Sequence, residues 1–152
     1  IGFGPAGQAA VRPLVDHAFR VVVIDLNHDS IRQVQILGIH GQIGDAMQFD
    51  VLEHARIEQC RAVIITVPHH HSALAILDNV RQQAPHAFVL VRSRYKLHSK
   101  EFASRGVVVV GDEEEVGVGL ANQIETWAQT QTVLKDDRLH DDTASSRSAM
   151  NT

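Results

Sequence analysis

The first residues of the chain have the spacing of a phosphate-binding turn. Gly2-Phe3-Gly4-Pro5-Ala6-Gly7 matches the pattern G-x-G-x-x-G. In this pattern the first glycine allows a tight turn, the second lets the backbone approach a pyrophosphate, and the third permits close packing of a helix on a strand. The N-terminus of the following helix then faces the phosphates. Glycine-rich turns are common, so the meaning of this one depends on the residues around it.

An acidic residue at the expected distance supports a nucleotide. Asp25 closes the apolar run 20–25 and follows Gly7 by 18 residues. A carboxylate at the end of the second strand bonds the hydroxyls of an adenosine ribose. It would also repel a 2′-phosphate, which predicts NAD(H) or AMP rather than NADP. The alternative, that Asp25 only caps a loop, is disfavoured because strand, turn, helix, strand and acid follow one another in order.

Two other groups of residues carry less specific chemistry. Gly44-Asp45-Ala46 follows a predicted strand, but by itself it is an ordinary turn. Three consecutive histidines occupy positions 69–71. Adjacent positions do not share a face of a helix or strand, so we predict no metal site there and favour a pH-responsive contact near the ligand. No arrangement of nucleophile and base stands out, so we predict no catalytic residues.

Short runs rich in β-branched residues alternate with segments of helical period. Continuous apolar strands indicate a parallel sheet covered on both faces by helices. Strands are predicted at 20–25, 62–67, 88–91 and 107–110, with a weaker one at 39–43 and a stub at Ile1. Helices are predicted at 5–18, 30–37, 51–56, 72–83, 98–105 and 113–130, the second capped by Asp29 and stopped by Gly38.

The pattern predicts an α/β fold, a Rossmann-like doubly wound parallel sheet of about six strands in a single domain. We expect this domain to span residues 1–134 and a disordered polar tail to span 135–152. The first strand is a stub and no methionine precedes it, so we expect further residues upstream.

Composition excludes several classes of protein. The chain has 14 Lys and Arg residues and 18 Asp and Glu residues, which give a formal charge of −4. This negative charge argues against a nucleic-acid partner. Hydrophobic residues make up 44% of the chain, too many for disorder throughout. Cys60 is the only cysteine, which favours a reducing compartment. No apolar run is long enough to span a membrane.

Four stretches together resemble the RCK, or TrkA-N, domain: GFGPAGQAA, VVVIDLNHDSIRQVQILGIHGQIGDA, VLEHARIEQCRAVIITVP and FVLVRSR. The similarity covers roughly residues 1–129. It is strongest to the C-terminal regulatory domain of monovalent cation:proton antiporter-2 proteins, which include glutathione-gated potassium efflux systems. The resemblance implies a non-enzymatic, nucleotide-binding domain at the cytoplasmic face of the cell membrane. It would gate a potassium or other cation transporter that lies upstream in the same chain or is a separate subunit.

The resemblance also implies roles for individual residues. Gly2, Gly4 and Gly7 would form the phosphate turn, Asp25 would hold the ribose, and Asp45 and Ala46 would meet the adenine. Arg92 matches a family arginine that reaches the ligand phosphates. Arg94 is a second candidate, although a solvated loop charge is an equally good interpretation. The full set of cofactor-binding candidates is Gly2, Phe3, Gly4, Pro5, Ala6, Gly7, Asp25, Leu26, Asp45, Ala46, Val67, Arg92 and Arg94.

Three questions stay open. The family often carries Asp or Asn after the fourth strand, where this chain has Pro-His-His-His-Ser at 68–72, so either NAD(H) or a shorter nucleotide such as AMP fits. An NAD-dependent oxidoreductase fragment or a soluble NAD redox sensor is the alternative function, although only about 20 polar residues follow the last predicted helix. Leu120, Ile124 and Trp127 share a helical face, which predicts a homodimer unless that face packs on its own sheet.

Overall fold

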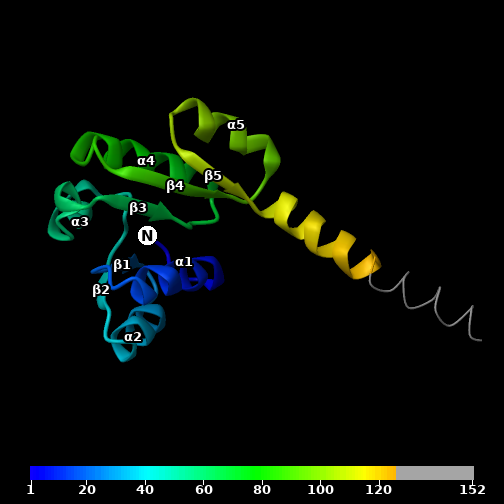
Figure 1. The fold of residues 1–152 in the computed structure, drawn as a ribbon. Helices are drawn as coiled ribbons and strands as arrows, with labels where there is room; N and C mark the ends of the chain where they lie inside the picture. The colour runs from blue at the N-terminus through cyan, green and yellow to red at the C-terminus, as the bar shows by residue number, and fades with distance from the viewer. Residues whose placement is uncertain (126–152) are drawn as a thin grey trace, which may run out of the picture. The chain divides into compact units, whose positions relative to one another are not determined.

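The computed structural model of the chain describes residues 1–125 (Figure 1). The chain divides into two compact units, Ile1–Glu113 and Glu114–Thr152. The first unit carries every candidate site residue and is described throughout. The second unit is described only as far as residue 125, so the predicted tail and Trp127 lie outside the described residues.

Within the described residues, five strands form two parallel sheets. One sheet pairs β1 (Val22–Asp25) with β2 (His40–Ile43). The other has the order β3 (Ala62–Ile65), β4 (Phe88–Ser93) and β5 (Val108–Gly111). The α/β class and the parallel pairing agree with the sequence prediction. Four of the strands lie at the predicted apolar runs, and β2 lies at the weaker strand predicted at 39–43.

The predicted sixth strand, the stub at Ile1, does not form. Instead, Ile1 and Gly2 run between the two sheets: the Gly2 amide donates to the Ile24 carbonyl at 2.8 Å, and the Ile1 amino group donates to Ile64 at 2.7 Å. The part of the chain that the structure describes therefore has five strands rather than about six.

The Ile1–Gly2 segment completes a familiar order. Across it the elements run β2, β1, Ile1–Gly2, β3, β4 and β5, which is the strand order of a doubly wound nucleotide-binding sheet. A groove of about 890 Å³ lies between β1 and β3 alongside this segment.

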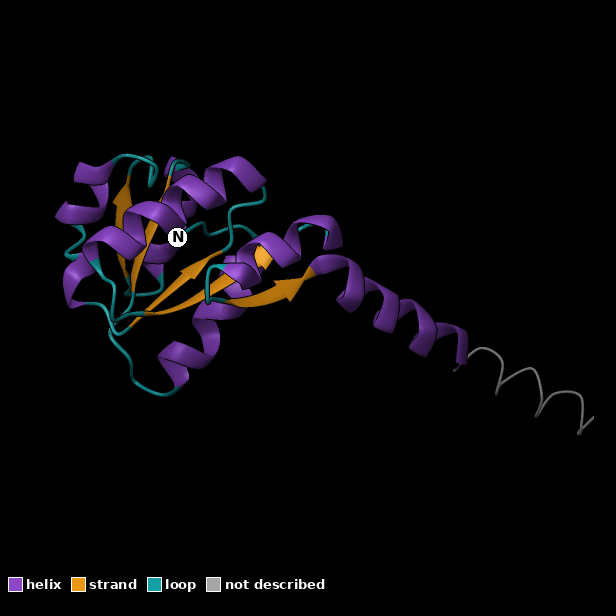
Figure 2. Ribbon diagram, turned by 90° about the horizontal axis from the view of Figure 1, so that it is seen from above, coloured by secondary structure: helices purple, strands orange, loops and turns teal. Residues whose placement is uncertain are grey.

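Helices lie on both sides of the strands (Figure 2). They are α1 (Pro5–Asp16), α2 (His28–Ile36), α3 (Phe49–His54), the 3₁₀ helix η1 (Ile57–Gln59), α4 (His70–Gln83) and α5 (Lys96–Ser104). Helix α2 packs on β1 and β2, α4 packs on β3, and α5 packs on β4 and β5. None of the described helices is long and apolar enough to cross a lipid bilayer.

Helix starts differ from the sequence prediction more than helix ends do. Helix α2 begins at His28, and its cap is Asn27, whose side chain accepts from the Asp29 amide at 2.8 Å. The expectation of Asp29 as the cap was therefore wrong, because Asn27 is an equally good cap two residues earlier. The predicted stop is confirmed: Gly38 follows the helix with φ +73°.

The hydrophobic core has two parts that match the two sheets. A larger cluster surrounds β3, β4 and α4 and includes the fully buried Leu52, Ile65 and Leu77. A smaller cluster joins Phe3, Val23, Ile31 and Val34 beneath the turn at the start of the chain. Each half of the site described below therefore rests on its own buried support.

The second unit begins within a helix that covers residues 112–125. The side chains of Leu120 and Ile124 are 60% and 63% exposed. The prediction that these residues form a shared face with Trp127 remains a prediction.

Candidate functional site

The glycine-rich turn connects the Ile1–Gly2 segment to α1, and two of its glycines are required by the chain itself. Gly2 has φ +89°, a conformation that L side chains rarely adopt. A Cβ on Gly7 would lie 2.1 Å from the Gly2 carbonyl oxygen, much closer than any real contact. The turn can close only with glycine at both positions.

Gly4 differs from its two neighbours. Its φ is −65°, and a Cβ placed there would have no described atom within 4 Å. Gly4 is also the N-cap of α1, and no side chain caps the helix; Pro5 follows at the first helical position. The space beside Gly4 is open and no side chain caps the first turn of α1, as an anion-binding helix N-terminus requires.

Phe3 occupies the turn in a different way from the other candidates. Its side chain is 2% exposed and belongs to the smaller core cluster. Only its backbone faces the site, where its amide donates to Asp25 Oδ2 at 2.5 Å. Ala6 is half-buried on α1.

Asp25 ends β1 directly beside the turn. Its second carboxylate oxygen, Oδ1, accepts from the Asn27 amide at 2.8 Å. Two backbone donors therefore hold the carboxylate in one orientation, and each oxygen keeps a lone pair for a further donor. Leu26, the next residue, is 67% exposed.

Asp45 follows the neighbouring strand, β2. The Gly44 amide donates to the Asp25 carbonyl at 3.1 Å, which brings the ends of β1 and β2 together. Asp45 Oδ1 accepts from the Met47 amide at 2.9 Å and so is held by its own turn. Ala46 is 5% exposed, so its side chain serves the core and only its backbone can meet a ligand.

Thr66 is a site residue that the sequence analysis missed. It follows β3, is 8% exposed, and places its hydroxyl 2.9 Å from the Gly2 carbonyl oxygen and 3.1 Å from that of Ile1. The hydroxyl thereby supports the turn from below. A polar residue at the end of an otherwise apolar run, just before Val67, was the signal for it.

The predicted phosphate-binding arginine has a partner within the chain. Arg92, in β4, donates from Nε to both oxygens of Asp112, at 2.8 and 3.0 Å, and from Nη2 to the same carboxylate. This pairing raises the pKa of Arg92 and lowers that of Asp112. Arg94 instead lies over the Tyr95 ring, 5.4 Å from its centroid. A ligand phosphate would have to compete with Asp112 for Arg92.

A small pocket of about 220 Å³ lies at the carboxyl ends of β3 and β4. Three predicted site residues line it: Val67, Arg92 and Arg94. His69 and His70 from the histidine run line it too, and so does His98 from α5. The structure therefore places the thirteen candidates in two groups, one around the turn and β1–β2 and one around this pocket.

The chain matches the TrkA-N domain model over residues 1–112. It belongs to the TrkA-N domain family. The glutathione-regulated potassium-efflux system protein KefC of Klebsiella pneumoniae (strain 342) is 28% identical to it over 106 residues, which is 70% of this chain and 17% of KefC. The chain therefore spans only about a sixth of that relative.

Solved structures share the TrkA-N fold. The Shewanella denitrificans Kef CTD in its AMP-bound form superposes with a TM-score of 0.75 at 22% identity, covering 84% of this chain and 78% of that one. The TrkA-N domain of the inner membrane protein ybaL from Escherichia coli gives 0.73 at 22% identity, covering 80% and 91%. The GsuK channel bound to NAD gives 0.63 at 19% identity, covering 72% and 20%. At these identities the likeness establishes the fold.

Proposed function

We propose that this TrkA-N domain binds an adenine nucleotide without a 2′-phosphate, of the NAD(H) or AMP type, and thereby regulates a potassium or other cation transporter. The observation that carries the proposal is Gly4. The chain itself needs glycine at positions 2 and 7 but has no steric use for it at position 4. A ligand phosphate close to the backbone would explain why position 4 is glycine, because any side chain there would lie between the phosphate and the amides of α1.

Asp25 supplies the choice of nucleotide. Its carboxylate is held beside the turn by the Phe3 and Asn27 amides, so its free lone pairs are oriented before the ligand arrives. Ribose hydroxyls would donate to them, whereas the 2′-phosphate of NADP would meet a like charge. Asp45 and the Ala46 backbone would meet the adenine, and Leu26 and Val67 would flank the ligand.

The relatives supply the regulatory half of the proposal. One is a potassium-efflux protein regulated by glutathione, one is described in an AMP-bound form, and one is a channel bound to NAD. By analogy, this domain would lie at the cytoplasmic face of a membrane and act on a transporter domain in its own chain or in a separate subunit. We also propose a homodimer, with Leu120, Ile124 and Trp127 at the interface.

Calorimetry on the 152-residue chain tests the binding. We expect AMP or NADH to bind at least about tenfold more tightly than NADPH, because the 2′-phosphate meets Asp25. Gly4→Val should abolish binding while the circular dichroism spectrum stays unchanged. Gly119→Val is the matched control, since a Cβ on Gly119 would also have no described atom within 4 Å and the residue lies in the second unit. Equal affinity for NADPH and NADH, or full binding by Gly4→Val, would contradict the proposal.

Regulation needs a separate measurement in the full-length transporter that carries this domain. Potassium efflux from cells should respond to nucleotide in the wild type and lose that response in Gly4→Val. Efflux that ignores nucleotide in both proteins, with nucleotide binding intact, would remove the regulatory half of the proposal and leave the binding half standing.

A further inference from the structure

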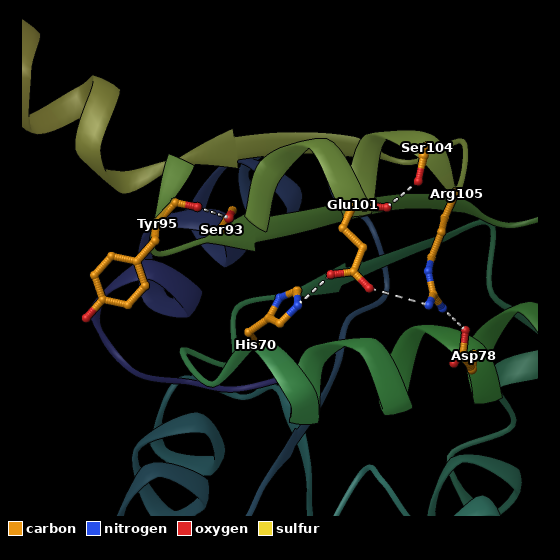
Figure 3. Close-up of polar contacts among 7 residues, drawn as sticks. All are labelled: His70, Asp78, Ser93, Tyr95, Glu101, Ser104 and Arg105. Carbon is orange, nitrogen blue, oxygen red and sulfur yellow. Dashed lines mark hydrogen bonds and ion pairs between the residues drawn. The ribbon is translucent and has the colours of Figure 1, made fainter. Parts of the chain in front are cut away.

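Three potential metal ligands from two helices meet beside the small pocket. His70 is the first residue of α4, and His98 and Glu101 are three residues apart on α5, so they share one face of that helix. One ligand atom from each lies within 4.8 Å of the others. Figure 3 shows the His70 ring directed at the Glu101 carboxylate across the gap between the helices, where Nε2 and Oε2 are 2.8 Å apart.

We propose that His70, His98 and Glu101 bind a divalent transition metal ion, for which Zn²⁺ is the best match. Two imidazoles and one carboxylate form a donor set that suits zinc and its neighbours in the first transition row. Magnesium and calcium prefer oxygen ligands only and are disfavoured. Three protein ligands leave a fourth position, which water would fill from the pocket side.

The distances permit such a site after a small rearrangement. In a tetrahedral zinc site with bonds of about 2.1 Å, neighbouring ligand atoms lie roughly 3.4 Å apart. The His70 and His98 rings are now stacked, with centroids 3.8 Å apart and planes at 15°, so their in-plane lone pairs run side by side. Turning the His98 ring out of the stack lets the lone pairs converge. His98 is half-buried and lines the pocket, which gives its ring room to turn.

The surroundings of His70 and Glu101 are compatible with a metal ion between them and His98. Nδ1 of His70 is buried and has no hydrogen-bond partner among the described residues, so a shift of this ring breaks no bond at that atom. Glu101 is steadied from its other oxygen by Arg105, whose Nη2 lies 3.9 Å from Oε1 and whose Nη1 pairs with Asp78 (Figure 3). Such an outer contact orients a metal-binding carboxylate.

The sequence did not point to this site because the histidine run was misleading. Only His70 of residues 69–71 belongs to the cluster, and its partners follow it by 28 and 31 residues. His71 is exposed, with its ring 5.5 Å from that of His70. This makes His71 a matched control: it has the same chemistry and neighbours the cluster in sequence, but it is not part of the cluster.

Metal titration of the EDTA-treated full chain tests the proposal. We expect one Zn²⁺ per chain by calorimetry, and with Co²⁺ the strong visible absorption of a four-coordinate ion. Glu101→Gln and His98→Gln should each weaken the binding by about 10–100-fold or more. His71→Gln should bind as the wild type does. Glu101 is exposed, so its variant should fold, and circular dichroism verifies this.

Two results would overturn the proposal. One is a wild-type chain that binds no stoichiometric Zn²⁺. The other is unchanged affinity in the double variant His98→Gln, Glu101→Gln, which would place the ion on other histidines of the chain. Neither result depends on nucleotide, so this test is separate from that of the proposed function.

Discussion

The two sides of the Ile1–Gly2 segment build their polar sites in different ways. On the β1–β2 side the groups are backbone amides and carboxylates held by backbone amides, as Asp25 is by Phe3 and Asn27. On the β3–β5 side they are polar side chains that bind one another, as Arg92 binds Asp112 and His70 binds Glu101. The first side holds its polar groups in place through the backbone, whereas the second holds them mainly by pairing side chains with one another.

This difference has energetic consequences. A site made of backbone tolerates no change of shape, because the atoms that bind are also the atoms that hold the fold. In a site made of paired side chains, a ligand can displace one partner at a moderate cost in free energy, because the remaining side chain exchanges one hydrogen bond for another. Substitutions that alter the backbone on the first side should therefore destabilise the fold strongly, and those that remove one of two paired side chains on the second should destabilise it weakly.

The largest expected effect comes from Gly7→Ala. The new methyl group would meet the Gly2 carbonyl oxygen at 2.1 Å, and both atoms belong to positions fixed by the backbone, so the turn must open. We expect a loss of at least about 3 kcal/mol in the free energy of unfolding, measured by urea denaturation. Gly4→Ala is the control and should change stability by less than about 0.5 kcal/mol. Equal losses of stability in Gly7→Ala and Gly4→Ala would contradict the conclusion that, of these two positions, only position 7 requires glycine for steric reasons.

The second largest effect is expected on nucleotide binding at the β1–β2 side. Asp25→Ala removes the proposed acceptor for the ribose hydroxyls, and charge-assisted bonds of this kind contribute about 1.5–3 kcal/mol. Calorimetry should show at least about a tenfold loss of affinity for NADH or AMP. Asp45→Ala tests the adenine end in the same way. An Asp25→Ala protein that is folded and binds with wild-type affinity would exclude Asp25 from the site.

The sequence predicted the β1–β2 side of the molecule better than the β3–β5 side. The glycine turn and Asp25 lie close together because the pattern itself encodes strand, turn, helix and strand, all local features. Each of the four apolar runs gave a strand, because strands of a parallel sheet covered on both faces need such runs. The weaker prediction at 39–43 also gave a strand, β2, although its sequence His-Gly-Gln-Ile is not an apolar run. The placement of Thr66 under Gly2 was missed because a single hydroxyl in an apolar run carries no period.

On the other side, the important contacts join residues far apart in the chain. Arg92 and Asp112 are 20 residues apart, and His70 and Glu101 are 31 apart. Charged residues occur throughout the surface, so no spacing rule selects which pairs will meet. The predicted strand at Ile1 failed for a different reason: two residues can bridge two sheets without forming a ladder of their own.

The third effect is an acid-dependent loss of stability from the Arg92–Asp112 pair. The folded-state pKa of Asp112 is lowered, chiefly by its hydrogen bonds to Arg92, so the pair stabilises the fold above the ordinary carboxyl pKa of 3.8. That stability disappears as the pH falls through the lowered pKa. Asp112→Asn should therefore cost about 1 kcal/mol at pH 7 and almost nothing at the lowest pH at which the protein stays folded.

The same variant also tests Arg92 as a phosphate ligand. With the carboxylate removed, the guanidinium no longer has to leave a charged partner, so nucleotide affinity should rise by several-fold. Arg92→Gln should lower it. Affinities that do not change in either variant would restrict Arg92 to a structural role.

The smallest effect is expected at the most exposed pair of the second side, Arg105 and Asp78. Their side chains are 36% and 63% exposed, and the bond ties the end of α5 to α4. Water and salt screen such a pair, so a double-mutant cycle with Asp78→Ala and Arg105→Ala should give a coupling energy of only about 0.5 kcal/mol, falling further in high salt. The cycle uses urea denaturation of the wild type, both single variants and the double variant. A coupling energy above about 1.5 kcal/mol would contradict the expectation that paired side chains on the β3–β5 side contribute little to the stability of the fold.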